Sequence, residues 1–176
     1  MIDFSRNHFE LFGLPERFGI DPGALDRRYR ALQSEIHPDR FATSGETERR
    51  VALQSSARVN EAYSALKDPV TRAQYLLSLH GVDALAESDS SLPLDFLERQ
   101  LERREVASDA LRARDAPALE ALLADVRADY AALEPHLAAL LDADSAWSAA
   151  RMRVRELKFL GKLAADVDAM LGELDS

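Results

Sequence analysis

The residues best placed to do chemistry form a short run, His37-Pro38-Asp39-Arg40. An imidazole and a carboxylate two residues apart could act as an acid–base pair, and an exposed carboxylate in a turn could instead pair with an arginine of another protein. Proline also disfavours helical geometry in the residue before it, so the run has a simpler interpretation as a turn that stops a helix. The intervening proline and the lack of a second polar cluster argue against an enzyme.

A second group of charged residues lies in the C-terminal half. Four carboxylates follow one another at steps of four, three and four residues, which places them on one face of a helix. They belong to Glu98, Glu102, Glu105 and Asp109. Leu97 and Leu101 form a neighbouring apolar pair on the same helix. These residues indicate either a docking patch or the core and the solvated face of a helical bundle.

Phe159, on another predicted helix, can likewise belong to the core or to a docking patch. It lies two residues after Leu157 and one before Leu160, so it falls roughly 100° away from the apolar stripe to which those leucines belong. An aromatic side chain in that position belongs either to the edge of the core or to an exposed binding surface.

The composition makes resident metal or nucleotide chemistry improbable. With no cysteine, the chain has no thiolate ligand, no cysteine nucleophile and no disulfide. The four histidines, His8, His37, His80 and His136, are scattered without ligand spacing. No glycine-rich phosphate loop is present, so we expect no bound ATP, no metal and no cofactor.

Charge and hydropathy also limit the partners. Residues 1–80 hold 11 basic and 11 acidic side chains, whereas residues 81–176 hold 11 basic and 20 acidic ones, so the net charge of −9 lies in the second half. A chain without a basic surplus is a poor binder of nucleic acid. Its apolar runs are too short to span a membrane, and residues 1–5 do not resemble an export signal. We therefore expect a cytoplasmic protein.

The elements that must position these residues are all predicted to be helices. Only 7 glycines and 7 prolines interrupt the sequence, and apolar residues recur at three- and four-residue steps. In the N-terminal half we expect a helix over residues 21–37, a polar loop over 39–45, a long helix over 46–67 and a shorter one over 68–81. Tyr29 falls on the apolar stripe of the first helix, and Tyr63 on the buried face of the long one. The first helix is basic where it faces water, with Arg27, Arg28 and Arg30.

The C-terminal half follows a polar, acidic stretch over residues 82–92, where we place the domain boundary. Three further helices are expected, and their short connections predict an antiparallel three-helix bundle. The predicted helices cover residues 95–112, 116–141 and 145–174. Asp95 followed by Glu98 indicates a capping box at the start of the first.

Several of these features occur together in one known family. The arginine-bearing first helix, the His37-Pro38-Asp39 turn and the second helix resemble the J-domain of DnaJ-type co-chaperones. Within the second helix and its end, the resemblance rests on Asn60-Glu61-Ala62-Tyr63 and Leu66-Lys67-Asp68-Pro69. Over the whole chain, the sequence resembles the HscB family, the J-type co-chaperones of iron–sulfur cluster assembly. The runs that carry this resemblance are FELFGLP at 9–15, RAQYLLSLHG at 72–81 and ELKFLGKL at 156–163.

The resemblance implies a J-domain over residues 1–81, a linker over 82–92 and a C-terminal scaffold-binding bundle over 93–176. The J-domain is expected to be a helical hairpin with shorter flanking helices. A member of this family docks its J-domain on the DnaK-type chaperone HscA and stimulates ATP hydrolysis there, while its bundle holds the scaffold protein IscU. The chain would thus be an adaptor with no catalytic residue of its own. A J-domain protein that delivers another client to a general DnaK-type chaperone is the alternative.

The resemblance also assigns residues to the two partners. On the chaperone side it implies His37, Pro38, Asp39 and Arg40 in the turn, with Arg27, Arg28 and Arg30 as an electrostatic dock. Arg40 stands where the family often has lysine, a change that keeps the charge but alters the geometry. On the scaffold side it implies Leu97, Leu101, Glu102, Glu105, Asp109 and Phe159. Glu98 stands where the family can place an apolar methionine and is left out of that set.

Overall fold

The computed structural model describes residues 3–41, 45–86, 92–143 and 145–174, with only the backbone of Pro38 and Asp39. Over these residues the chain forms helices and no strand, which confirms the predicted all-α class. It divides into two compact units, Met1–Leu79 and His80–Ser176. None of the helices in the described ranges is long and apolar enough to cross a membrane.

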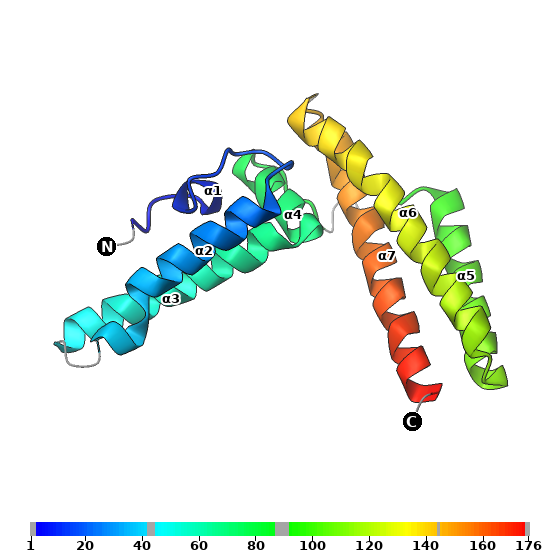
Figure 1. The fold of residues 1–176 in the computed structure, drawn as a ribbon. Coiled ribbons are helices and arrows are strands. Elements are labelled where there is room, and N and C mark those ends of the chain that lie inside the picture. Colours follow the sequence, from blue (N-terminus) through cyan, green and yellow to red (C-terminus); the bar gives the residue numbers. More distant parts are fainter. Residues whose placement is uncertain (1–2, 42–44, 87–91, 144, 175–176) are drawn as a thin grey trace. The chain divides into compact units, whose positions relative to one another are not determined.

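The first unit is built around a pair of helices packed along each other (Figure 1). Its elements are α1 (His8–Leu11), α2 (Pro22–Ile36), the 3-10 helix η1 (Pro38–Phe41), α3 (Glu46–Lys67) and α4 (Pro69–Leu79). The helices α1, α2 and α4 all contact α3, which makes α3 the centre of the unit. The core is apolar and includes Phe9, Phe12, Leu25, Val59, Leu66, Leu76 and Leu77.

Local signals explain where these helices begin and end. The Asp21 carboxylate accepts a hydrogen bond from the Gly23 amide at 2.8 Å, and Pro22 occupies the first helical position. The helix ends at Ile36, because His37 precedes a proline and adopts φ −55°, ψ 128°. The predicted loop after it contains a turn of 3-10 helix, whereas the long helix α3 has the predicted bounds.

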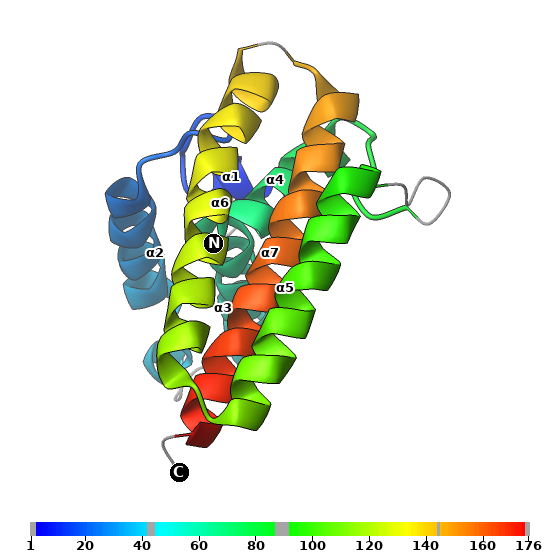
Figure 2. The same cartoon turned by 90° about the vertical axis from the view of Figure 1, so that its right-hand side faces the viewer.

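The second unit is a three-helix bundle of α5 (Leu94–Ala113), α6 (Ala116–Asp142) and α7 (Trp147–Leu174), which lie side by side in Figure 2. Its apolar core is built mainly from α6 and α7. The fully buried residues of that core include Leu119, Val126, Leu137, Val154, Leu157, Leu160 and Val167. From α5 the buried side chains are Gln100, Arg103, Ala107 and Ala110, and none of these is a large apolar residue.

Arg103 joins α5 to α6 by ion pairs. Its side chain is only 8% exposed, and one guanidinium nitrogen lies 2.6 Å from the Asp125 carboxylate and 2.7 Å from that of Asp129. Burial by itself would lower the pKa of Arg103, but the hydrogen bonds to Asp129 and Asp125 outweigh it and raise that pKa. The arginine therefore stays charged and points toward α6.

The expected start of two helices was wrong. Pro93 rather than Asp95 is the N-cap of α5, with φ −54° and ψ 139° and no side-chain cap. Asp95 is therefore already within the first helical turn and forms no capping box. The last helix begins at Trp147 rather than Ser145, because Ser145 has φ +50°, which a right-handed helix excludes.

The segment before α5 belongs to the second unit and, over its described residues, packs against α7. Ala84 is buried, and the Arg155 guanidinium of α7 donates hydrogen bonds to the carbonyl oxygens of Ala84 and Ala86 at 2.8 and 2.7 Å. These residues belong to the stretch 82–92 that the sequence predicts as a linker, and residues 87–91 of it lie outside the described ranges.

A histidine is buried in the first unit. His8 is 5% exposed, and its ring stacks on Tyr75 with centroids 4.0 Å apart. Its Nδ1 has no hydrogen-bond partner among the described residues. Burial, with a further contribution from the positive charge of Arg58, lowers the pKa of His8 below its ordinary value.

We predict that lowering the pH reduces the free energy of unfolding of the wild-type chain more than that of the His8→Phe variant. This variant keeps an aromatic ring on Tyr75. The lowered pKa means that the unfolded state takes up the proton first. The stability that the neutral His8 side chain contributes is thus fully present above about pH 6.5, and it is lost as the pH falls below that value toward the folded-state pKa. Urea denaturation of both proteins at about pH 7.5 and about pH 5 measures the difference. Equal losses in the two proteins would contradict the assignment to His8.

Candidate functional site

The turn after α2 is held by its last residue. The Arg40 amide donates to the His37 carbonyl at 3.0 Å, and the Arg40 guanidinium donates to the Ser34 carbonyl in the last turn of α2 at 2.9 Å. Arg40 thus fixes the backbone that carries Pro38 and Asp39 against the end of the helix. The side chains of those two residues lie outside the described part of the structure, so the exposure of the Asp39 carboxylate stays a prediction.

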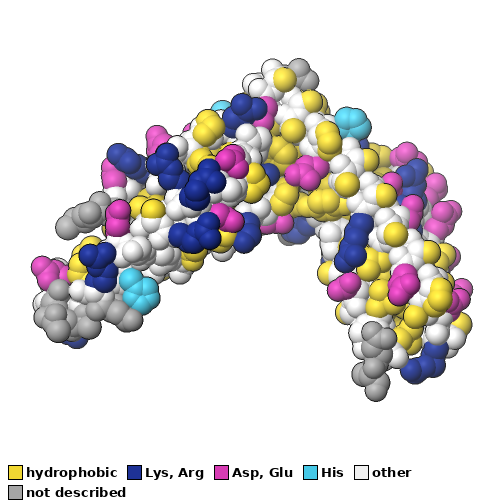
Figure 3. All heavy atoms as spheres, in the orientation of Figure 1, with side chains coloured by type: hydrophobic (Ala, Val, Ile, Leu, Met, Phe, Trp, Pro, Cys, Tyr) yellow, Lys and Arg dark blue, Asp and Glu magenta, His cyan; other side chains and the backbone are white. Residues whose placement is uncertain are grey.

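The predicted arginine face lies on the same helix as this turn. Arg27, Arg28 and Arg30 are all exposed, and Figure 3 shows Lys and Arg side chains gathered over the unit that contains α2. Arg27 pairs with Asp21 at 3.4 Å, but both side chains are more than 60% exposed and such a pair contributes little to stability. Arg30 lies two helical turns before His37, which is roughly 10 Å along the axis. The face can therefore attract an acidic protein to the turn.

A network of tyrosines on α2 and α3 was not predicted from the sequence, which placed both rings among apolar neighbours. Tyr29 and Tyr63 are half-buried and stack with ring centroids 4.0 Å apart. The Tyr63 hydroxyl donates to the Asp26 carboxylate at 2.8 Å and accepts from Lys67 at 2.7 Å, a hydrogen bond that raises the pKa of Lys67. The two helices are thus joined at their surface by polar contacts as well as by the core.

The second candidate surface lies on α5. The structure shows whether its two leucines belong to the core or to the surface. Leu97 is 39% exposed and Leu101 is 61% exposed, so neither belongs to the bundle core. Leu94, which the sequence analysis did not single out, is 71% exposed and lies two turns before Leu101 on nearly the same line. An apolar row of this kind on a helix surface is typical of an interaction site.

Phe159 of α7 lies next to this row and is 37% exposed. Its ring meets the edge of Phe96 with centroids 6.3 Å apart, and the Arg104 guanidinium of α5 lies over it at 5.8 Å from the centroid. Because Arg104 is one turn after Leu101, the ring borders the same edge of α5 as the leucines. The predicted off-stripe position of Phe159 is confirmed, and its orientation is fixed by two neighbours.

The four carboxylates of α5 are all exposed and lie on the outer side of the leucines. Asp109 forms an ion pair with Arg112 of its own helix. The structure thus brings Leu97, Leu101 and Phe159 together as the centre of one surface. Glu102, Glu105 and Asp109 lie along its edge.

No group of three or more His, Cys, Asp or Glu side chains within the described ranges is arranged to hold a metal ion. His80, instead of facing other ligands, stacks on the Trp147 ring with centroids 4.0 Å apart.

The chain is similar to known proteins over its full length. A family model described as the HSCB C-terminal oligomerisation domain matches residues 92–168, which contain both α5 and Phe159. A co-chaperone protein HscB homolog from Paraburkholderia phymatum is 46% identical over 176 residues, which is the full length of both chains. The chain belongs to the HscB co-chaperone family.

Solved structures agree with the fold of this family. Chaperone HscB from Vibrio cholerae is 40% identical, superposes with a TM-score of 0.84 and is matched over 96% of this chain and 99% of its own. Human co-chaperone HscB superposes with a TM-score of 0.88, covering 95% of this chain and 83% of the human one, but at 24% identity this supports the fold alone. An all-α J-domain followed by a C-terminal bundle is therefore the architecture of the chain, in which α2, η1 and α3 form the J-domain hairpin.

The contrast between neighbouring residues of α7 gives a direct test of the docking surface. We predict that Leu160→Ala, which truncates a side chain that is 1% exposed, destabilises the bundle by about 2 to 5 kcal/mol, whereas Phe159→Ala costs less than about 1 kcal/mol. Thermal and urea unfolding of both variants gives the two values. Equal losses of stability in the two variants would show that Phe159 belongs to the core and not to the docking surface.

Proposed function

We propose that the chain is a cytoplasmic adaptor that brings an iron–sulfur cluster scaffold of the IscU type to a DnaK-type chaperone of the HscA type. The J-domain binds the chaperone and stimulates its ATP hydrolysis, and the C-terminal bundle holds the scaffold. The chain contributes no catalytic group to this hydrolysis. It acts by favouring the hydrolysis-competent arrangement of the chaperone, which is an allosteric effect.

The observation that carries this proposal is the apolar surface of Leu97, Leu101 and Phe159 in a member of the HscB family. A helix that buries alanines and polar side chains while it exposes Leu97 and Leu101 gains little folding stability from those two leucines. Their exposure is explained if a partner covers them. The row of carboxylates beside them would then select a partner whose apolar residues are flanked by positive charge.

The chaperone side is supported by the geometry of the first unit. Arg40 holds the backbone of the turn by hydrogen bonds to the His37 and Ser34 carbonyls, and these contacts do not involve the carboxylate of Asp39. The arginines of α2 would steer an acidic chaperone surface toward this turn, an effect that depends on ionic strength. The proposed chaperone-binding set is His37, Pro38, Asp39 and Arg40 with Arg27, Arg28 and Arg30.

A second candidate for the apolar surface is another copy of the same chain. The model that matches residues 92–168 is named for oligomerisation, and exposed leucines are typical of self-association as well. Sedimentation of the chain alone at several concentrations distinguishes the two. A monomer that forms a heterodimer with the scaffold supports the proposal, whereas a stable homodimer that buries Leu101 contradicts it.

We predict that Asp39→Ala abolishes stimulation of the chaperone ATPase while the fold and scaffold binding remain intact. The reason is that the hydrogen bonds of Arg40 still hold the backbone of the turn in the variant, whereas the proposed contact with the chaperone is lost. Steady-state ATP turnover by the chaperone is measured with the wild-type chain, with the variant and with Glu120→Ala, which removes one exposed carboxylate from α6. Full stimulation by Asp39→Ala would refute the role of the turn.

We further predict that the combined Leu97→Ala, Leu101→Ala and Phe159→Ala variant weakens scaffold binding at least about 100-fold, because a few apolar anchors dominate an interface. Its melting temperature and its stimulation of the chaperone without scaffold should be unchanged. Titration calorimetry with the scaffold measures the loss.

Val106→Ala is the matched control for this variant. Val106 is 50% exposed on the same helix but lies roughly 140° around it from Leu101. The control should bind the scaffold like the wild-type chain. If the triple variant binds as tightly as the control, the surface serves another purpose.

A further inference from the structure

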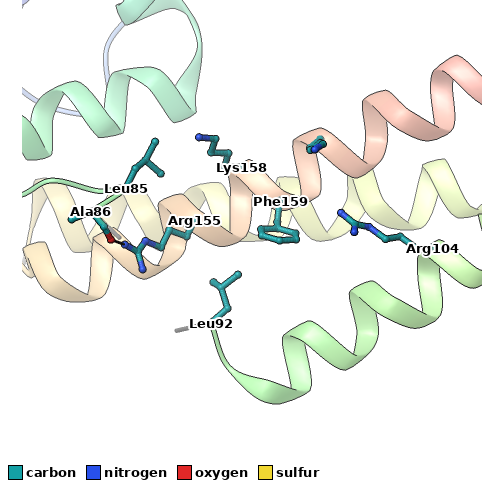
Figure 4. Close-up of a pocket in the computed structure, with 8 residues that line it drawn as sticks. Leu85, Ala86, Leu92, Arg104, Arg155, Lys158 and Phe159 are labelled. Carbon is teal, nitrogen blue, oxygen red and sulfur yellow. Dashed lines mark hydrogen bonds between the residues drawn. The ribbon is translucent and has the colours of Figure 1, made fainter. Parts of the chain in front are cut away.

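A pocket opens beside Phe159 (Figure 4). It measures about 480 Å³, and its apolar wall includes Leu85, Leu92 and the Phe159 ring. The charged side chains that line it are all cationic. They belong to Arg104, Arg155, Lys158 and Lys162.

These cations have no carboxylate to neutralise them among the described residues. Arg155 donates to two carbonyl oxygens, and Arg104 lies over the face of Phe159. For Lys158 and Lys162 of α7, the described residues offer no carboxylate within ion-pair distance, and both side chains are exposed. Over its described residues, the pocket therefore concentrates positive charge in a chain whose net charge is −9.

The cations of α7 repeat the spacing of the carboxylates of α5. Residues 151, 155, 158 and 162 are basic, at steps of four, three and four, and residues 98, 102, 105 and 109 are acidic at the same steps. Each set therefore lies on one helix face. Within the described ranges no ion pair joins Arg155, Lys158 or Lys162 to the acidic row, and Leu97, Leu101 and Phe159 lie between the two rows. The surface is thus basic on α7, apolar in the middle and acidic on α5.

We propose that this pocket receives an acidic side chain of the scaffold, beside the apolar residue that covers Phe159. The inference rests on the proposed function and adds the orientation of the partner. A scaffold segment must place its negative charge over α7 and its positive charge over α5, because the reverse orientation sets like charges against each other on both sides. A pocket of this size holds a few side chains, and its apolar wall would strengthen the ion pair by excluding water.

Charge reversal in the pocket tests this placement. Lys158→Glu and Lys162→Glu should each weaken scaffold binding roughly three- to thirtyfold at about 0.05 M salt, and the defect should shrink at about 0.5 M. Both variants should melt like the wild-type chain. Titration calorimetry at the two salt concentrations gives the affinities.

The control is Arg127→Glu, which makes the same change of net charge. Arg127 is exposed on α6, outside the pocket, and pairs with Asp168 at 3.3 Å. Its affinity should stay within about twofold of wild type. Equal behaviour of the lysine variants and this control would overturn the pocket assignment alone, whereas no binding by the wild-type chain would overturn the proposed function with it.

A charge exchange then identifies the occupant. Single Asp→Lys and Glu→Lys variants of the scaffold are titrated against Lys162→Glu, and one of them should restore binding while weakening binding to the wild-type chain. If no scaffold variant restores binding, the cations attract the scaffold only through long-range electrostatics, and the placement of a side chain in the pocket is wrong. A change of self-association in Lys162→Glu, seen by sedimentation, would instead assign the pocket to a second copy and overturn the proposal.

Discussion

The second unit depends on how α5 is turned about its own axis, and the buried charge of Arg103 sets that rotation. A guanidinium that is 8% exposed requires carboxylate partners, because a buried charge without them costs several kcal/mol. Asp125 and Asp129, one turn apart on α6, supply those partners. Turning α5 to bury Leu97 or Leu101 would pull Arg103 away from both of them. The same two ion pairs therefore hold the helix in place and keep its leucines on the surface.

This rotation separates stability from recognition within the bundle. The large buried side chains come from α6 and α7, with Leu119, Val126 and Leu160 among them, while α5 contributes Ala107 and Ala110 to the same core. Small residues let α5 lie close to its neighbours without filling the core itself. Side chains on the outer face of α5 are then free to vary with the partner, because no core packing constrains them. The exposed leucines of α5 and the buried leucines of α6 are thus chemically alike but serve opposite purposes.

Local sequence signals predicted most of the helices and part of the site. The caps and prolines around α2 and α3 act within a few residues, so the bounds of α3 were predicted correctly. The capping box at Asp95 failed because the N-cap of α5 is Pro93, two residues earlier. The phase of Phe159 placed it off the buried face that the neighbouring leucines define, but left the edge of the core and an exposed surface as alternatives. The phase of Leu97 and Leu101 could not decide their burial, because the face that α5 buries is fixed by Arg103 and two carboxylates more than 20 residues away. The repeated 4-3-4 spacing of cations on α7 was present in the sequence, but only the fold brings that row and Phe159 alongside α5. The roles of the turn residues came from family resemblance.

The division into two compact units also bears on how an adaptor of this kind would work. The residues proposed for the chaperone all lie before Leu79, and those proposed for the scaffold all lie after His80, so the two sets share no side chain. Two proteins bound to one chain are held at a high local concentration, in the millimolar range for a short connection, without any new contact between the two sites of that chain. Allosteric coupling between the two sites would need a structural element with two alternative conformations, and each partner would have to shift the equilibrium between them. Holding the partners together needs only that each unit fold and bind by itself. Because the proposed sets fall in separate units, the chain can act by proximity alone, and any coupling between scaffold and chaperone would then arise where those two proteins meet.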